Sequence, residues 1–179
     1  INNNLGYNLR LAHAPYATGT SVPPQDLWDE QPGISFKQRE LLFDDLGRER
    51  ALDYALDHPG RELELAVKRV LYLLESDAAA SIDWSESLGS TPLDGWRDAY
   101  VLAGDIYWYA MLALAAASAL LVPRTRAAWS LWSTVAVWIA LHTMFAGEPR
   151  YHVPLTPVIA ALAAATLAAI VTRTRVRSF

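Results

Sequence analysis

Three long apolar segments follow one another in the second half of the chain, and they restrict its fold more than any other feature. They cover residues 99–122, 127–146 and 153–172. Each is long enough, as a helix, to cross roughly 30 Å of hydrocarbon. A buried helical hairpin of a soluble protein is the alternative, but three such segments in succession favour three transmembrane helices. We therefore expect an all-α membrane protein.

Acidic residues divide the chain into two regions. Of the 19 acidic residues, 17 precede residue 99. This asymmetry predicts an outer region of loops and amphipathic helices over residues 1–98, a membrane region of three helices over 99–172, and a short basic tail over 173–179. Ile1 stands where a start methionine would be expected, so the sequence is interpreted as part of a longer protein.

Arginines predict the orientation in the membrane. The turn 123–126 contains Arg124 and Arg126, the tail contains three more arginines, and neither contains an acid. Short loops rich in Lys and Arg remain in the cytoplasm. We therefore expect a multi-pass protein of the plasma (inner) membrane, with residues 1–98 and the turn 147–152 extracytoplasmic and the C-terminus cytoplasmic.

The outer region is expected to be only partly helical. Residues 1–34 are rich in Asn, Gly, Pro and Ser, which predicts an irregular but structured loop. Ser35 and Gln38 match a capping box, so a helix is predicted over residues 36–56. The Asp-His-Pro-Gly run at 57–60 should end this helix.

A second, amphipathic helix is predicted after this break. Its apolar residues recur at the spacing of one helical face: Leu63, Ala66, Val67, Val70, Leu71 and Leu74. Its other side is predicted to carry Glu62, Glu64, Lys68, Arg69 and Glu75. Such a helix could lie on the bilayer surface or pack on a protein partner, and the membrane segment that follows favours the surface.

Polar residues near the outer ends of the apolar segments are candidates for function. Arg150 lies in the run Gly-Glu-Pro-Arg-Tyr-His-Val-Pro-Leu-Thr-Pro (147–157), where a fixed guanidinium could bind an anionic headgroup or simply mark the membrane boundary. Asp105, His142 and Glu148 are predicted to form a polar cluster at the outer leaflet. The alternative is that each is hydrated at the interface.

Other chemistries find no support in the sequence. The chain has no cysteine, which excludes disulfides and thiolate metal sites. It has no phosphate-binding glycine loop and no metalloprotease or serine-hydrolase motif, and its four histidines lack metal-ligand spacing. Basic residues do not cluster with aromatic ones outside the apolar segments, so we expect no nucleic-acid partner. No cofactor is evident.

Three segments of the chain resemble a known family. The run 141–157 resembles the last outer turn of polyprenyl-phosphate-dependent membrane glycosyltransferases of the GT-C superfold, in the group of protein O-mannosyltransferases and aminoarabinose transferases. Residues 8–19 are similar to a second segment of that family, in which a Gly-Asn-Asn triplet stands in place of Ala12-His13-Ala14. Residues 51–68 resemble its outer domain, so the resemblance spans most of the chain in the expected order.

This resemblance implies the C-terminal portion of an enzyme that moves a sugar from a polyprenyl-phosphate donor to an acceptor on the outer face of the membrane. The family's acidic base lies in its first outer loop, which this chain lacks, so no catalytic residue is assigned and the fragment alone should be inactive. The donor's lipid phosphate would be bound by Arg150, Tyr151, His152 and Lys68. Boundary anchoring remains the alternative for Arg150 and Lys68.

The expected partners follow from the same resemblance. They are the polyprenyl-phosphate-linked sugar, membrane lipids, and the missing N-terminal transmembrane half or other membrane subunits. A divalent metal is possible in the parent enzyme. The alternative function is that of a non-catalytic structural subunit of a larger membrane complex with a transferase-like fold.

Overall fold

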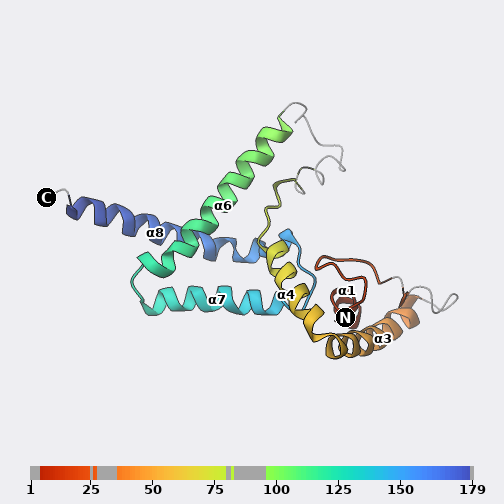
Figure 1. Cartoon of the computed structure of the whole chain (residues 1–179). Coiled ribbons are helices and arrows are strands. Elements are labelled where there is room, and N and C mark those ends of the chain that lie inside the picture. Colours follow the sequence, from red (N-terminus) through yellow and green to blue (C-terminus); the bar gives the residue numbers. More distant parts are fainter. Residues whose placement is uncertain (1–4, 25, 28–35, 80–81, 83–95, 178–179) are drawn as a thin grey trace. The chain divides into compact units, whose positions relative to one another are not determined.

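The computed structural model describes residues 5–24, 26–27, 36–79, 82 and 96–177 (Figure 1). Over these ranges the chain is helical and has no strand, which confirms the all-α prediction for this part. The main helices are α1 (Leu5–Ala12), α3 (Phe36–Asp57), α4 (Pro59–Leu73), α6 (Arg97–Leu121), α7 (Arg126–His142), the 3-10 helix η1 (Pro149–Leu155) and α8 (Thr156–Arg177).

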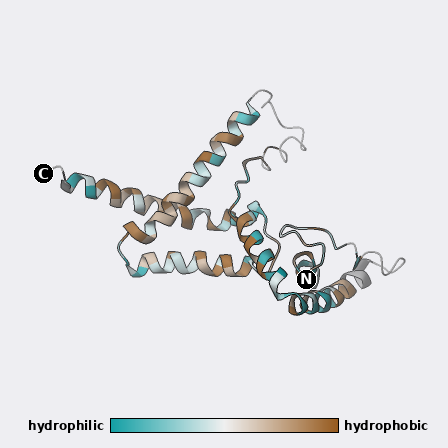
Figure 2. Ribbon diagram, viewed as in Figure 1, coloured by the Kyte–Doolittle hydropathy of each residue, from teal (hydrophilic) through white to brown (hydrophobic). Residues whose placement is uncertain are grey.

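Two helical segments are long and apolar enough to cross a membrane. They are Arg97–Leu121 and Pro149–Arg175 (Figure 2). In their most apolar windows only 22% and 28% of residues are buried within the molecule. Most of their apolar surface therefore faces outward, as in a membrane helix, whereas the core helix of a soluble protein is mostly buried.

The second predicted membrane segment, 127–146, extends four residues beyond the helix that is observed. The α7 helix ends at His142 and has 17 residues, the lower limit for a membrane span. The helix ends there because the backbone that follows His142 forms hydrogen bonds with other segments of the chain. The Thr143 carbonyl accepts a hydrogen bond from Arg69, and the Gly147 N–H donates to the Gly19 carbonyl.

The chain forms two compact units that do not follow the predicted boundary at residue 98. The first unit combines Ile1–Glu75 with Ile139–Tyr151, and the second combines Ser76–Trp138 with His152–Phe179. The turn after α7 thus packs with the N-terminal region, from which it is far removed in sequence. The tail predicted over 173–179 is also partly helical, because α8 continues to Arg177.

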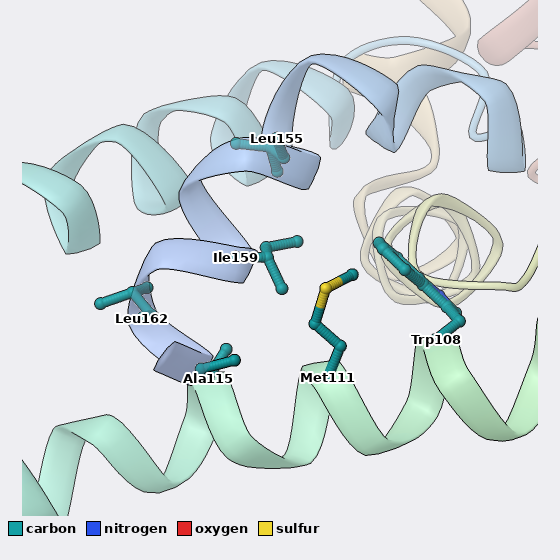
Figure 3. Packing of buried hydrophobic residues seen from close by; sticks show 7 residues of the cluster. Trp108, Met111, Ala115, Leu155, Ile159 and Leu162 are labelled. Atoms are coloured by element: carbon teal, nitrogen blue, oxygen red, sulfur yellow. The ribbon is translucent and has the colours of Figure 1, made fainter. Parts of the chain in front are cut away.

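The core of the second unit lies between α6 and α8. Residues at helical spacing on α6 meet a matching row on η1 and α8 (Figure 3). This cluster consists of Trp108, Met111, Ala115, Leu155, Ile159, Leu162 and Ala163. The buried Thr166 hydroxyl donates to the Leu114 carbonyl (2.9 Å), which satisfies a polar group between two apolar helices.

Residues Leu5–Ala12 form the helix α1, so the prediction of an irregular loop over residues 1–34 is wrong for this part. Two glycines let the backbones of α1 and α3 meet. A Cβ on Gly6 would lie 1.7 Å from the Asp44 carbonyl oxygen, and one on Gly47 would lie 2.5 Å from the Gly6 oxygen. The Gly6 N–H also donates to the Asp44 carboxylate (2.6 Å). This short helix is therefore formed by packing rather than by local propensity.

The helix predicted over 36–56 is confirmed as α3. The break after it is also confirmed, since His58 separates α3 from α4 and Pro59 opens the new helix. Proline suits this first position because its missing N–H would have no partner there. The predicted cap residue Ser35 lies outside the described residues.

The α4 helix buries a different face from the one predicted to be apolar. Its fully buried residues are Leu65, Arg69 and Leu73, so the placement of Arg69 on the solvent side is wrong. Three residues of the predicted apolar face are exposed on the first unit, namely Leu63 (71%), Val67 (55%) and Leu71 (64%), and the other three are half-buried. Contact of this face with a bilayer or a partner stays a prediction.

Lipid contact of this face can be tested with single cysteines, because the native chain contains none. We expect a spin label at Val67→Cys, in nanodiscs of phosphatidylcholine and phosphatidylglycerol, to collide more with oxygen than with a water-soluble nickel chelate. Glu64→Cys, on the polar flank, should show the reverse. Equal access of the chelate to both labels would contradict bilayer contact, and a label at 67 shielded from both reagents would indicate a protein partner.

Candidate functional site

The turn after α7 and the loop after α1 are joined into one structure in the first unit. The Gly147 N–H donates to the Gly19 carbonyl at 2.7 Å. Nε2 of His13 lies 2.9 Å from the Met144 carbonyl oxygen. Gly19 has a φ of 103°, a left-handed conformation that side chains other than hydrogen rarely adopt. Two segments more than 120 residues apart in sequence are thus held side by side.

Arg69 is the central residue of this junction. Its guanidinium donates to the Thr143 carbonyl of the turn and to the Ala12 carbonyl at the end of α1 (2.6 Å). It also contacts the Glu62 carboxylate at 3.2 Å. Burial lowers the pKa of Arg69, and the negative charge of Glu62 partly opposes this. One buried cation therefore ties together three parts of the chain.

His13 completes the junction through the same carboxylate. Its Nδ1 lies 2.7 Å from Glu62, opposite the contact of Nε2 with Met144. Both ring nitrogens thus face oxygen atoms that can accept a hydrogen bond. Glu62 is shared by His13 and Arg69 and is only 16% exposed. His13 therefore helps to hold the turn in place.

A pocket of about 200 Å³ lies beside this junction. The N-terminal region contributes Asn8, Leu11 and Ser21, and the turn contributes His142, Phe145, Ala146 and Tyr151. The rings of His142 and Tyr151 are 5.6 Å apart and tilted by 43°. The walls of the pocket therefore combine apolar side chains with hydrogen-bonding groups in similar measure, which could contact a small polar group of a ligand.

Four of the predicted site residues come together near this pocket. Arg150 is 69% exposed, and its guanidinium lies 5.4 Å from the centre of the Tyr151 ring. It forms an ion pair with Glu148 at 2.5 Å. His142 and Tyr151 line the pocket itself. Glu148, Arg150, Tyr151 and His142 are thus neighbours in the first unit, and the roles assigned to them stay predictions.

The other three predicted residues do not line this pocket. Lys68 pairs with Glu64 on the surface of α4 (2.8 Å). Hydrogen bonds from Lys68 and Arg61 lower the pKa of Glu64 to about 2. His152 belongs to the second unit, where it is buried and stacked on Trp108 at 3.9 Å between ring centres. Asp105, also in the second unit, is half-buried on α6, and its inclusion in the polar cluster stays a prediction.

Sequence reasoning missed Arg69, Glu62 and His13 as organisers of the site. A signal for Arg69 was present, because Leu65, Arg69 and Leu73 recur at intervals of four and so share one helical face. A cation between two apolar residues on a face is a candidate for burial with partners. No comparable signal exists for His13, whose partners lie 49 and 131 residues away.

A second polar network fixes the loop that leads to the pocket. Arg10, buried on α1, forms an ion pair with Asp26 (2.8 Å), and the Tyr16 hydroxyl donates to the same carboxylate (2.5 Å). Burial alone would raise the pKa of Asp26, but these hydrogen bonds outweigh it and lower that pKa. Burial and the bond to Asp26 raise the pKa of Tyr16. The network holds residues 10–26 against α3, where Arg50 provides a further contact.

The side chains near this pocket are groups that can bind a ligand. In the described ranges, no three His, Asp or Glu side chains gather as metal ligands would. The groups at the pocket are a guanidinium, an imidazole, a phenol and small polar side chains, which suit recognition of an anion and of hydroxyl groups.

Comparisons with protein-family models, with curated proteins and with solved structures found no match to this chain.

Proposed function

We propose that this chain is the C-terminal portion of an integral-membrane glycosyltransferase that uses a polyprenyl-phosphate sugar donor. In this proposal α6, α7 and α8 cross the membrane, residues 1–98 lie outside, and the C-terminus lies in the cytoplasm. The pocket beside the outer turn receives the phosphate and first sugar of the donor. The catalytic base comes from a part of the enzyme beyond this chain.

The observation that carries the proposal is the junction between residues 8–19 and the turn after α7. These two segments resemble the same family separately, and nothing in their sequences requires them to meet. They nevertheless bond to each other through His13, Gly19 and Arg69 and line one pocket. This pairing is what a shared role in binding one ligand would require.

Arg150 is the residue best suited to contact the phosphate. It is exposed beside Tyr151, and its neighbour Glu148 holds the guanidinium in place. A planar guanidinium can donate two parallel hydrogen bonds to a phosphate, and its fixed charge would stabilise the phosphate as it leaves the sugar. His142, Asn8 and Ser21 offer hydrogen bonds to sugar hydroxyl groups in the pocket.

We expect Arg150→Ala to weaken use of the donor by about 10- to 150-fold, because a charge-assisted hydrogen bond contributes roughly 1.5 to 3 kcal/mol. Arg150→Lys should recover only part of this loss, since an ammonium cannot reproduce the two-point contact. Donor kinetics of the full-length enzyme in nanodiscs measure both effects. Arg48→Ala, which removes an exposed arginine paired with Asp45, is the matched control.

Two outcomes would contradict the proposal. Donor kinetics of Arg150→Lys equal to those of the unmodified enzyme would make Arg150 a membrane-boundary anchor, because a lysine reaches the interface equally well. A protein that binds no polyprenyl phosphate, but purifies stably with an unrelated membrane complex, would instead be a non-catalytic subunit.

A further inference from the structure

A crevice in the second unit opens between the end of α6 and the start of α7. It has a volume of about 400 Å³. Its walls are mainly apolar and include Ala119 and Val122 from the α6 side and Trp129, Trp132 and Ala136 from α7. From the start of α7 to Ala136 the helix rises about 15 Å. The crevice can therefore accommodate an extended hydrocarbon chain rather than only a small polar ion.

Positive charge surrounds the end of this crevice. Arg124 lines it, and Arg126 opens α7. Arg173 of α8 donates to the Leu121 carbonyl at the end of α6 (3.1 Å), which brings a third cation to the same end of the unit. The sequence contains no acid between Asp105 and Glu148, and none after Glu148. Arg124 and Arg126 are exposed and form no ion pair within the described residues, so both are available to an anion.

Polar groups lie just inside this basic end. Ser118 lines the crevice, and its buried hydroxyl has no hydrogen-bond partner in the described part of the chain. The Leu114 carbonyl, one turn before Ser118 in the helix, already accepts a hydrogen bond from the Thr166 hydroxyl. Trp129 is 60% exposed at the crevice, and an indole N–H is a donor that favours the polar boundary of a membrane. These groups suit ester oxygens located between a headgroup and its acyl chains.

We propose that this crevice binds an anionic phospholipid. Its phosphate contacts Arg124 and Arg126, and one acyl chain lies along Trp132 and Ala136. Basic pockets between membrane helices recognise acidic headgroups in this way. The inference depends on α6 and α7 lying in a membrane, and it is independent of the transferase assignment. The crevice is at the first residues of α7, whereas His142 is its last residue.

Native mass spectrometry of the full-length protein in detergent tests this inference by titration with phosphatidylglycerol and phosphatidylcholine. We expect tighter binding of phosphatidylglycerol, weakened about fivefold by each of Arg124→Gln and Arg126→Gln. Ala136→Trp should also weaken binding by tenfold or more, because it fills the crevice without changing the charge. All three residues are exposed, so these variants should fold. Arg48→Gln is the control for loss of one positive charge.

Three results would overturn the inference. Equal affinity for the two lipids would exclude recognition of the acidic headgroup. Unchanged phosphatidylglycerol binding in Ala136→Trp, with loss in the arginine variants, would mean attraction to surface charge without use of the crevice. Displacement of the lipid by glycerol phosphate at similar concentration would mean that the headgroup alone is bound. Since no polyprenyl phosphate is present, these results do not depend on the outcome for Arg150.

Discussion

Replacement of Arg69 by methionine is expected to lower the thermal unfolding midpoint of the protein by about 10 °C. The substitution keeps much of the side-chain volume but removes the donors to the Thr143 and Ala12 carbonyls and one of the two partners of Glu62. Breaking a buried charge pair by removing one partner costs about 3 to 5 kcal/mol, and about 1 kcal/mol shifts the midpoint of a chain of this size by 2 to 4 °C. Thermal unfolding of the purified protein in detergent, followed by tryptophan fluorescence, measures the shift.

The neighbouring residue provides the control for Arg69. Lys68→Met removes the same charge one position away, but Lys68 is 42% exposed and pairs with Glu64 on the surface of α4. Exposed pairs of this kind contribute little to stability, so the midpoint should move by no more than about 2 °C. Equal shifts for the two variants would show that the bonds of Arg69 do not hold the turn to α4.

Gly147→Ala is expected to open the same junction from its other side. A Cβ at this position would lie 2.3 Å from the Arg69 carbonyl oxygen and 2.8 Å from its backbone carbon atoms. The atoms in the way are backbone atoms, which cannot rotate aside as the end of a side chain can. The turn must therefore move, which should lower the free energy of unfolding by about 1 to 3 kcal/mol. Because Ala146 lines the pocket, polyprenyl phosphate should also bind at least tenfold more weakly, as measured by titration in nanodiscs.

Gly60→Ala is the matched control for this glycine. Gly60 lies in the first turn of α4, and a Cβ there would meet no atom within 4 Å. Alanine also restricts the unfolded chain more than glycine does, so this variant should be neutral or slightly more stable. A Gly147→Ala protein with unchanged stability and binding would mean that the close contact of the turn with α4 is not needed for the site.

The helices could be predicted where the signal for each lies within its own segment. The start of α4 follows from Pro59, and α6 follows from one long apolar segment. The α1 helix was not predicted in this way, because it is short and lies in a segment rich in Asn, Gly, Pro and Ser. It forms because Gly6 fits against the backbone of α3 near Asp44, a contact across 38 residues that no local pattern records.

The candidate site was predictable only in part, for a similar reason. Glu148, Arg150 and Tyr151 are adjacent in sequence, so their proximity to one another followed from the motif. The contribution of Asn8 and Ser21 to the same pocket depends on bonds that join distant segments. His152 could not be placed from the motif. It follows Tyr151 directly in the 3-10 helix, yet its ring stacks on Trp108 in the second unit.

The composition of the first unit also determines when it can be completed during synthesis. Its residues Ile139–Tyr151 emerge from the ribosome only after α6 and most of α7 have been made. Until then Arg69 lacks the Thr143 carbonyl and His13 lacks the Met144 carbonyl. The first unit therefore cannot close around Arg69 until the end of α7 has been synthesised.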